Sequence, residues 1–453
     1  MSSTLQIINP STEQPVATVA MADVSETDRV IERAAKAAPD WRRVSPADRA
    51  RLLRRFAEVV DSHNEELARL EVANAGHTIG NARWEANNVR DVLHYYAAAP
   101  ERHIGKQIPV AGGIDLTFYE PLGVVAIIVP WNFPMPIAGW GFGPALAAGN
   151  TVVLKPAMQT PLTAMRLGEL ALEAGIPEGV FTVVPGGGAT VGNRFVTNEK
   201  VRKVCFTGSS PVGKQIMAGA AEQMKRVTLE LGGKSANIIF ADADLEKAAA
   251  GAPYAVFDNA GQDCCARSRI LVQDSVYDRF MERFEAAVKN MKVMDPTSTE
   301  SEMGPLISAG QRETVRSYVD ESLVAFRGSA PEGAGYWMAP TVMTSDGSDR
   351  AFREEIFGPV ASVVRFSDEA EAVRIANDSP FGLSGSIWTR DSGRALRVAR
   401  AVETGALSVN SNSSVRYATP FGGFKQSGIG RELGPDALRA FSEEKNVFIS
   451  TEE

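Results

Sequence analysis

Short apolar runs alternate with segments of helical spacing through the middle of the chain. The runs span residues 124–129, 151–154, 181–184, 203–206, 227–229 and 237–240. Amphipathic patterns, such as those at 161–174 and 211–225, fill the intervals between them. Short apolar strands separated by helices are typical of a mostly parallel sheet covered on both faces. The pattern therefore predicts an α/β fold.

Helical patterns also precede this region. Ser25 followed by Asp28 resembles a capping signal, and the apolar residues after it repeat at helical spacing as far as Pro39. A longer helical region is predicted from Pro46, with an apolar stripe that continues to Leu70. We interpret this stripe as core packing.

The remaining patterns indicate a hairpin, a second α/β region and a final strand. Residues 107–120 form two strand-like runs around two glycines, which is typical of a hairpin. A helix is predicted from about Val276, because apolar residues recur every fourth position, and residues 446–450 resemble a strand. The most plausible domain boundary is the pair Gly232-Gly233.

Composition narrows the class of partner. The chain has 453 residues, 44% of them hydrophobic, and a net charge of −8, which disfavours nucleic acid or an anionic membrane. Three cysteines and four histidines offer no zinc-site spacing, so no metal is expected. The N-terminus lacks signal-peptide character, and no run of about 18 apolar residues occurs. We expect a cytoplasmic protein that acts on a small molecule.

A candidate catalytic nucleophile lies in residues 259–269, NAGQDCCARSR. Cys264 is the candidate nucleophile, although a thiol needs help to ionise, and adjacent cysteines can also be buried small hydrophobes. Histidine partners are distant, since all four lie upstream. Glu230, which ends a strand-like run before two glycines, is the candidate general base that later activates water.

Two glycine-rich turns follow predicted strands, at residues 183–188 and 206–214. In the second, Gly208 and Gly213 bracket a helix start, where main-chain N–H groups can meet a phosphate. The turn also matches the GxxxxGK pattern of nucleoside-triphosphate loops, but the next residue is Gln215 where Ser or Thr should bind magnesium, which counts against an NTPase. The GxGxxG fingerprint of dinucleotide-binding folds does not occur in the sequence. On their own, these residues indicate a nucleotide-binding α/β enzyme with a thiol nucleophile.

Seven motifs in this order resemble the NAD(P)-dependent aldehyde dehydrogenases over nearly the whole chain. They are PWNFP at 130–134, KPA at 155–157, FTGS at 206–209, ELGGK at 230–234, GQDC at 261–264, EIFGP at 355–359 and PFGG at 420–423. The resemblance implies an α/β fold with two Rossmann-like α/β domains and a small β oligomerisation element.

It also implies three parts: a cofactor-binding domain at 1–106 and 122–232, a catalytic domain at 233–430, and an oligomerisation element at 107–121 and 431–453. Members of the family assemble, so a homodimer or homotetramer is expected.

The family mechanism assigns roles to the candidate residues. Cys264 attacks the aldehyde carbon, the thiohemiacetal gives hydride to the nicotinamide, and water activated by Glu230 releases the acid. The resemblance places the oxyanion between the Asn132 side chain and the Cys264 main-chain N–H. A donor of this kind is typically worth ~10²–10³ in rate.

NAD or NADP is the implied cofactor. By resemblance its contacts are Trp131, Lys155, Met158, Gly188, Gly208, Ser209, Gly213, Leu231, Glu355 and Phe357. Many NAD-preferring members carry Glu where this chain has Met158. A thioether cannot replace a carboxylate that accepts from both ribose hydroxyls, and its neutrality removes repulsion against a 2′-phosphate. The choice between the two cofactors therefore stays open.

Substrate contacts are less defined. Phe133, Trp140, Asp263 and Phe421 are the candidates. An Asp263 side chain in the tunnel favours neutral or cationic aldehydes, whereas an Asp263 ion pair with Arg267 or Arg269 is only structural. Alternatives to the hydrolytic enzyme are a semialdehyde or CoA-acylating dehydrogenase of the same superfamily, and an inactive binding or structural relative.

Overall fold

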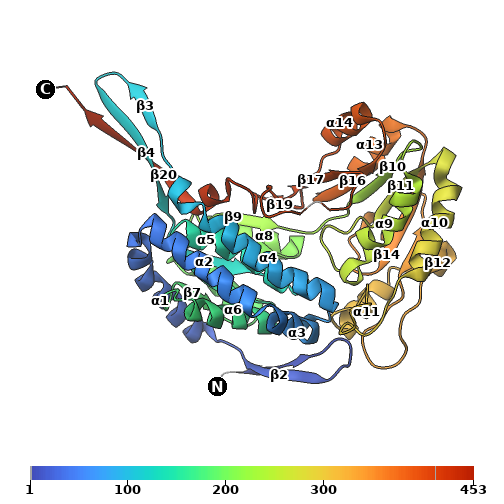
Figure 1. Cartoon of the computed structure of the whole chain (residues 1–453), viewed down its shortest axis with the longest axis horizontal. Helices are drawn as coiled ribbons and strands as arrows, with labels where there is room; N and C mark the ends of the chain where they lie inside the picture. The colour runs from blue at the N-terminus through green and yellow to red at the C-terminus, as the bar shows by residue number, and fades with distance from the viewer. Residues whose placement is uncertain (1–2, 414, 453) are drawn as a thin grey trace.

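The computed structural model, which describes residues 3–413 and 415–452, has two α/β lobes and a projecting arm (Figure 1). The first lobe is built on a six-stranded sheet of order β19-β9-β8-β5-β6-β7, parallel except for β19. Its strands are β5 (Val124–Ile128), β6 (Thr151–Lys155), β7 (Phe181–Val183), β8 (Val201–Thr207), β9 (Arg226–Glu230) and β19 (Gly428–Ile429).

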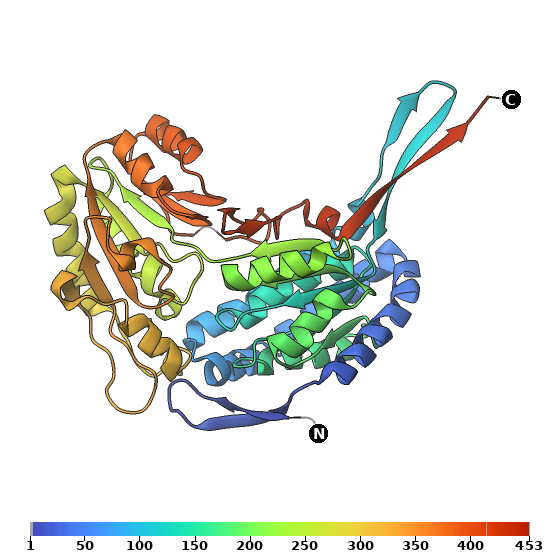
Figure 2. The same cartoon turned by 180° about the vertical axis from the view of Figure 1, so that it is seen from behind.

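Alternation along β5 explains why helices cover both faces of this sheet. Val125 and Ile127 pack into one apolar cluster, and Val124 and Ala126 pack into another on the opposite face. Helices α2 (Pro46–Ser62), α4 (Ile79–Ala97), α5 (Pro134–Ala147) and α6 (Leu162–Glu173) contribute to the first cluster. Helices α1 (Val24–Arg43), α7 (Asn193–Thr197) and α8 (Ser210–Ala221) contribute to the second (Figure 2).

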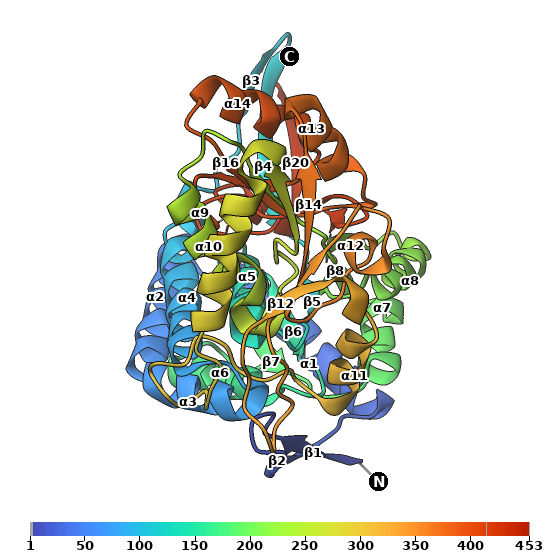
Figure 3. The ribbon, with the colours of Figure 1, turned by 90° about the vertical axis from the view of Figure 1, so that its right-hand side faces the viewer.

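The second lobe repeats this design on a seven-stranded sheet, in which only β12 is antiparallel. Its order is β12 (Val324–Arg327), β13 (Thr341–Thr344), β14 (Val360–Phe366), β11 (Arg269–Gln273), β10 (Ala236–Ile239), β16 (Ser384–Trp388) and β17 (Ala406–Val409). Helices α9 (Leu245–Phe257) and α10 (Tyr277–Asn290) pack on one face, and α13 (Glu369–Asn377) and α14 (Ser392–Ala401) on the other (Figure 3). The predicted fold class is confirmed.

The arm is a three-stranded antiparallel sheet that projects from the first lobe (Figure 1). It contains β3 (Gln107–Val110), β4 (Gly113–Pro121) and β20 (Ser442–Ser450). Strand β20 pairs with β4 along its full length, from Ser442 opposite Pro121 to Ser450 opposite Gly113. The predicted hairpin and final strand therefore belong to one element, while the domain limits stay a prediction.

The remaining α-helices and strands are additional to the two main sheets, the helix layers described above and the arm. They are β1 (Thr4–Ile8), β2 (Pro15–Ala20), α3 (Asn64–Ala75), α11 (Ala309–Arg316), α12 (Arg350–Arg353), β15 (Phe381–Gly382) and β18 (Phe424–Lys425). No helix of the described residues is long and apolar enough to cross a membrane.

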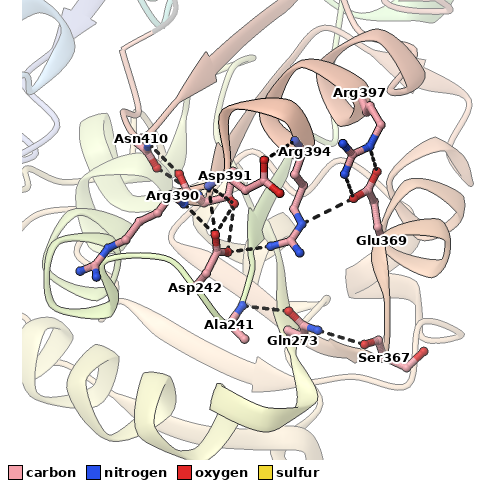
Figure 4. Close-up of polar contacts among 11 residues, drawn as sticks. Ala241, Asp242, Gln273, Ser367, Glu369, Arg390, Asp391, Arg394, Arg397 and Asn410 are labelled. Atoms are coloured by element: carbon pink, nitrogen blue, oxygen red, sulfur yellow. Dashed lines mark hydrogen bonds and ion pairs between the residues drawn. The ribbon is translucent and has the colours of Figure 1, made fainter.

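A carboxylate joins the ends of neighbouring strands in the second lobe (Figure 4). Asp242, just after β10, accepts hydrogen bonds from the Thr389 hydroxyl at 2.8 Å and from the main-chain N–H of Arg390 at 3.0 Å. Arg394 of α14 donates to the same carboxylate at 2.8 Å and also lies 3.5 Å from Glu369. This network fixes the loop after β16 against β10.

The predicted start and end of the first N-terminal helix are wrong. Helix α1 begins after Asp23, whose side chain accepts from the Glu26 N–H, and it continues through Pro39 to Arg43. Trp41 beyond the proline is buried against the first sheet, so packing outweighs the cost of Pro39. The region from Pro46 is two helices, which meet at His63.

Candidate active site

Residues 258–268, here called the cysteine loop, connect α9 to β11 and begin in an unusual backbone conformation. Asn259, Ala260 and Gly261 have φ values of +50°, +54° and +69° in succession. Such conformations cost energy in residues with side chains and concentrate at functional sites. A Cβ on Gly261 would lie 2.1 Å from the carbonyl oxygen of Gly358, so only glycine permits this approach. The cysteine loop is therefore pressed against the EIFGP segment.

Glu230 reaches the same place from the first lobe. It is the last residue of β9, and the chain then passes through Gly232 and Gly233 toward the second lobe. A Cβ on Gly233 would lie 2.4 Å from the carbonyl oxygen of Cys264. The two glycines thus let the main chain after the acid pass directly beside the main chain of the thiol.

Two cavities meet at these residues. The first, of about 240 Å³, is lined by Pro130, Trp131, Asn132, Thr207, Gly208, Ser209, Glu230, Leu231, Gly232, Cys264, Gln311, Glu355 and Phe357. The second, of about 320 Å³, is lined mainly by aromatic and acidic side chains together with Thr207, Glu230, Cys264 and Cys265. Thr207, Glu230 and Cys264 belong to both walls, so the thiol and the acid lie at the junction.

The first cavity gathers most of the predicted cofactor contacts. Trp131 and Phe357 meet edge to face with ring centroids 5.2 Å apart. Glu355 accepts a hydrogen bond from the Gly233 N–H at 2.9 Å. Gln311, which sequence reasoning missed, also lines this cavity and donates to the Phe357 carbonyl at 2.8 Å. No motif marks Gln311, because only the fold brings α11 to this wall.

The other predicted cofactor residues lie at or after the carboxyl ends of the first sheet's strands. Lys155 ends β6, and its Nζ donates to the Pro156 carbonyl at 2.7 Å. Burial lowers the pKa of Lys155 to about 8. Met158 is 40% exposed near Gly187, and a Cβ on Gly188 would meet open space. Gly213, by contrast, packs against Leu231.

Asn132 is buried beside the cysteine loop. Its side-chain amide donates to the Gln262 carbonyl at 3.0 Å, and its own carbonyl accepts from the Asn259 amide at 2.8 Å. The amide nitrogen therefore points to the segment that carries Cys264, as a donor for a developing oxyanion must.

This environment raises the pKa of both Cys264 and Glu230. A hydrogen bond with Cys265 and burial raise the pKa of the Cys264 thiol well above its ordinary value. Burial raises the pKa of Glu230 strongly, and the nearby carboxylate of Glu432 adds to the effect. Both oxygens of Glu230 lie buried without a hydrogen-bond partner among the described residues. Both oxygens of the acid are therefore available to a reacting water.

The second cavity contains all four predicted substrate residues, Phe133, Trp140, Asp263 and Phe421. Trp140 donates from its indole nitrogen to Asn88 at 2.9 Å and meets the Phe421 ring edge to face at 5.5 Å. Sequence reasoning missed Trp84 and Asp258, which line the same cavity.

Asp263 does not form an ion pair with Arg269. Its carboxylate accepts from the Cys265 N–H at 2.8 Å, and Arg269 donates instead to main-chain carbonyls of Lys234, Ile375 and Ala376. Burial raises the pKa of Asp263, and it also raises the pKa of Asp258, to which the charge of Asp263 contributes. Two carboxyl groups therefore line one largely apolar cavity.

A thiol and a buried acid thus lie at the junction of two cavities, beside a parallel sheet of nucleotide-binding type. The model of the aldehyde dehydrogenase family matches residues 1–447. The chain belongs to this family.

Relatives and solved structures agree over almost the whole chain. An aldehyde dehydrogenase of Emericella nidulans is 41% identical, covering 98% of this chain and 91% of the relative. A betaine aldehyde dehydrogenase of Mesorhizobium japonicum is 40% identical, covering 99% and 94%. The structure of PnpE from Pseudomonas sp. WBC-3 superposes with a TM-score of 0.97 at 40% identity, covering 100% and 95%.

A structure of betaine aldehyde dehydrogenase from Staphylococcus aureus in complex with NAD+ has a TM-score of 0.96 at 37% identity, covering 100% of this chain and 92% of that one. The protein is accordingly an NAD(P)-dependent aldehyde dehydrogenase.

The two adjacent thiols should differ in function. Cys264→Ala is expected to abolish aldehyde-dependent reduction of the cofactor, because of the two adjacent thiols only that of Cys264 lines both cavities. Cys265→Ala should retain most activity, since Cys265 is buried and lines only the second cavity. Steady-state rates of both variants check this, and equal losses would contradict the assignment.

Proposed function

We propose that the protein oxidises an aldehyde to its carboxylic acid through a Cys264 thioester, which water activated by Glu230 hydrolyses. The observation that carries this proposal is the shared position of Cys264 and Glu230 in the walls of both cavities. One cavity would admit the aldehyde and the other would hold the cofactor, with the thiol and the acid at the junction between them.

Each residue has a defined task. The Cys264 thiolate adds to the aldehyde carbon, and the Asn132 amide stabilises the oxyanion that forms. A nicotinamide cofactor held by the residues of the first cavity would supply the hydride acceptor for the oxidation. Glu230 then takes a proton from water as it attacks the thioester, which releases the acid and returns the thiol.

A water-activating acid at the thiol favours hydrolysis over transfer of the acyl group to CoA. Cys264, Glu230 and Asn132 all line the first cavity, which disfavours an inactive binding or structural relative. A semialdehyde dehydrogenase is the second candidate, and it is distinguished below by substrate charge.

Glu230→Gln should separate the two halves of the reaction. Removing the base slows thioester hydrolysis more than hydride transfer, so a burst of reduced cofactor, about one per active site, should precede a slow steady state. Stopped-flow absorbance measures the burst. Loss of the burst would show that Glu230 acts earlier, in ionising the thiol.

The residues around the first cavity fit a nicotinamide dinucleotide. Gly188 leaves open space, and Gly208 and Ser209 lie where β8 ends and α8 begins, a suitable place for phosphates. Glu355 lies in the same wall as Cys264, as a group that holds the nicotinamide ribose would. The Staphylococcus aureus relative binds NAD+, and we propose that this chain binds NAD or NADP.

Met158→Glu should shift preference toward NAD. The new carboxylate restores an acceptor for ribose hydroxyls and repels a 2′-phosphate. The ratio of kcat/KM for NAD to that for NADP is expected to rise about tenfold, which corresponds to ~1.4 kcal/mol. Met217→Glu, at an exposed position on α8, is the matched control. An unchanged ratio in Met158→Glu would contradict the assignment.

The second cavity supports a preference for neutral or cationic aldehydes. Asp258 and Asp263 contribute carboxyl groups, while Trp84 and Trp140 contribute aromatic rings. Carboxylates and aromatic faces both attract an ammonium group. Two charges about 6 Å apart interact by roughly 3 kcal/mol at an effective dielectric of ~20, before screening. A substrate carboxylate is disfavoured for the same reason.

Asp263→Asn tests this selectivity without removing the acceptor for the Cys265 N–H. We expect kcat/KM of the wild type to rank 4-aminobutanal above pentanal and pentanal above succinic semialdehyde, and the variant to lose about tenfold in the ratio of the first to the last. Asp278→Asn, whose carboxylate pairs with Arg365 on the surface, is the control. Succinic semialdehyde as the best substrate, or an unchanged ranking, would contradict charge selection.

We further propose that the arm makes the protein a homodimer or homotetramer. Six apolar side chains of the arm are exposed: Ile108, Val110, Ile114, Phe118, Phe448 and Ile449. Exposed apolar surface on a sheet with free edges favours association. The cytoplasmic location stays a prediction.

Light scattering coupled to size-exclusion chromatography tests the assembly. Ile114→Asp combined with Phe448→Asp should lower the molar mass to that of a smaller species, whereas Leu396→Asp, on exposed α14, should leave it unchanged. A monomeric wild type would contradict the proposal.

A further inference from the structure

Three ionisable side chains are buried together behind the PWNFP loop. Glu71 comes from α3, His77 follows that helix, and Glu85 comes from α4; at most 3% of each residue is exposed. One oxygen or nitrogen from each lies within 4.8 Å of the others. None of the three belongs to the described walls of the two cavities. The chemistry outlined above gives this cluster no role.

Both sides of the His77 ring have polar partners. Its Nδ1 contacts a carboxyl oxygen of Glu85 directly. Burial lowers the pKa of His77, while a hydrogen bond to the main chain of Asn132 acts in the opposite direction. The ring also lies against Phe133, with centroids 5.8 Å apart. His77 therefore joins the buried acids to the residues beside the thiol.

We propose that His77 is a positioning residue for aldehyde oxidation: it donates a hydrogen bond to the Asn132 carbonyl and so holds the Asn132 amide where the oxyanion forms. This inference rests on the proposed role of Asn132. Glu85 contributes by fixing the ring from behind, and Glu71 lies beside both.

The buried acids explain which ring nitrogen carries the proton. Burial raises the pKa of Glu71 to about 8 and that of Glu85 well above its ordinary value, which favours the neutral form of both. A neutral cluster avoids the cost of burying unpaired charge. A protonated Glu85 donates to Nδ1, which leaves the ring proton on Nε2, the nitrogen that then faces the Asn132 carbonyl.

The loop around Asn132 needs such an anchor. Helix α5 begins after Phe133, and no side chain caps its first turn. The Asn132 carbonyl accepts from the Asn259 amide at 2.8 Å, but Asn259 belongs to the strained cysteine loop. His77 is fixed instead by the helical layer of the first lobe. A hydrogen bond donated by His77 therefore fixes the loop around Asn132 independently of the cysteine loop.

The same three residues resemble the ligand set of a divalent cation. However, direct contact with Glu85 engages Nδ1, and the bond to Asn132 engages the other nitrogen. We therefore assign the cluster to positioning, and metal binding is an outcome that the test below detects.

Three variants at this position test the assignment. His77→Leu removes the donor, and His77→Asn leaves an amide too short to reach the carbonyl. His77→Gln retains a donor near the original nitrogen. Single-turnover formation of reduced cofactor should fall about 10- to 100-fold in His77→Leu and His77→Asn, and should recover largely in His77→Gln. His103→Leu, which removes a hydrogen bond to Ser442, is the matched control and should stay near the wild-type rate.

Alkylation of Cys264 by iodoacetamide distinguishes positioning from general damage. This displacement forms no oxyanion, so its rate should stay within about twofold of wild type in every His77 variant. Asn132→Ala should itself slow single-turnover oxidation, and adding His77→Leu to it should slow the reaction no further. KM for the cofactor should not change.

Each contrary result has its own meaning. If Asn132→Ala leaves the rate unchanged, the proposed oxyanion role fails, and with it this inference. If Asn132→Ala slows oxidation but His77→Asn does not, or if the two losses multiply, only the positioning role is overturned. About one divalent metal ion per chain, retained by wild type and lost from His77→Gln, would also overturn it.

Discussion

The close approach of three main-chain segments is the constraint on which the site depends. Gly233 lies against the carbonyl of Cys264, and Gly261 lies against the carbonyl of Gly358, so neither position has room for a Cβ. These contacts join the end of the first sheet to the cysteine loop and the EIFGP segment of the second lobe. Because of them, a carboxylate from one lobe and a thiol from the other share the walls of the same two cavities.

Burial governs the chemistry at this junction. Desolvation raises the pKa of Glu230, Asp263 and Glu355, the last to about 7, and it contributes to the raised pKa of Cys264. Burial therefore favours the neutral forms of these acidic groups until a substrate or cofactor changes the local charge. A positive charge on a bound nicotinamide, or on an ammonium group of the aldehyde substrate, would favour the ionised forms of these residues. Binding would then be coupled to activation of the thiol.

Local sequence patterns predicted the parts of this protein that depend on local physics. Apolar runs located the parallel strands, and motif order located Cys264, Glu230 and Asn132. Residues that depend on tertiary contact were missed: Gln311 and Asp258 reach the cavities from segments without a motif, and β19 joins the first sheet from about 200 positions along the chain from its neighbour β9. Helix α1 continues through Pro39 because burial of Trp41 outweighs a local rule.

Mass spectrometry of the Glu230→Gln protein, quenched after mixing with NAD+ and an aldehyde, tests the central claim most directly. A thioester on Cys264 adds the mass of the aldehyde less two hydrogens, because hydride has left and the thiol proton has been lost. We predict this adduct on the peptide that contains Cys264, and none in Cys264→Ala. An adduct on Cys265, or reduced cofactor formed without any adduct on the protein, would contradict the account.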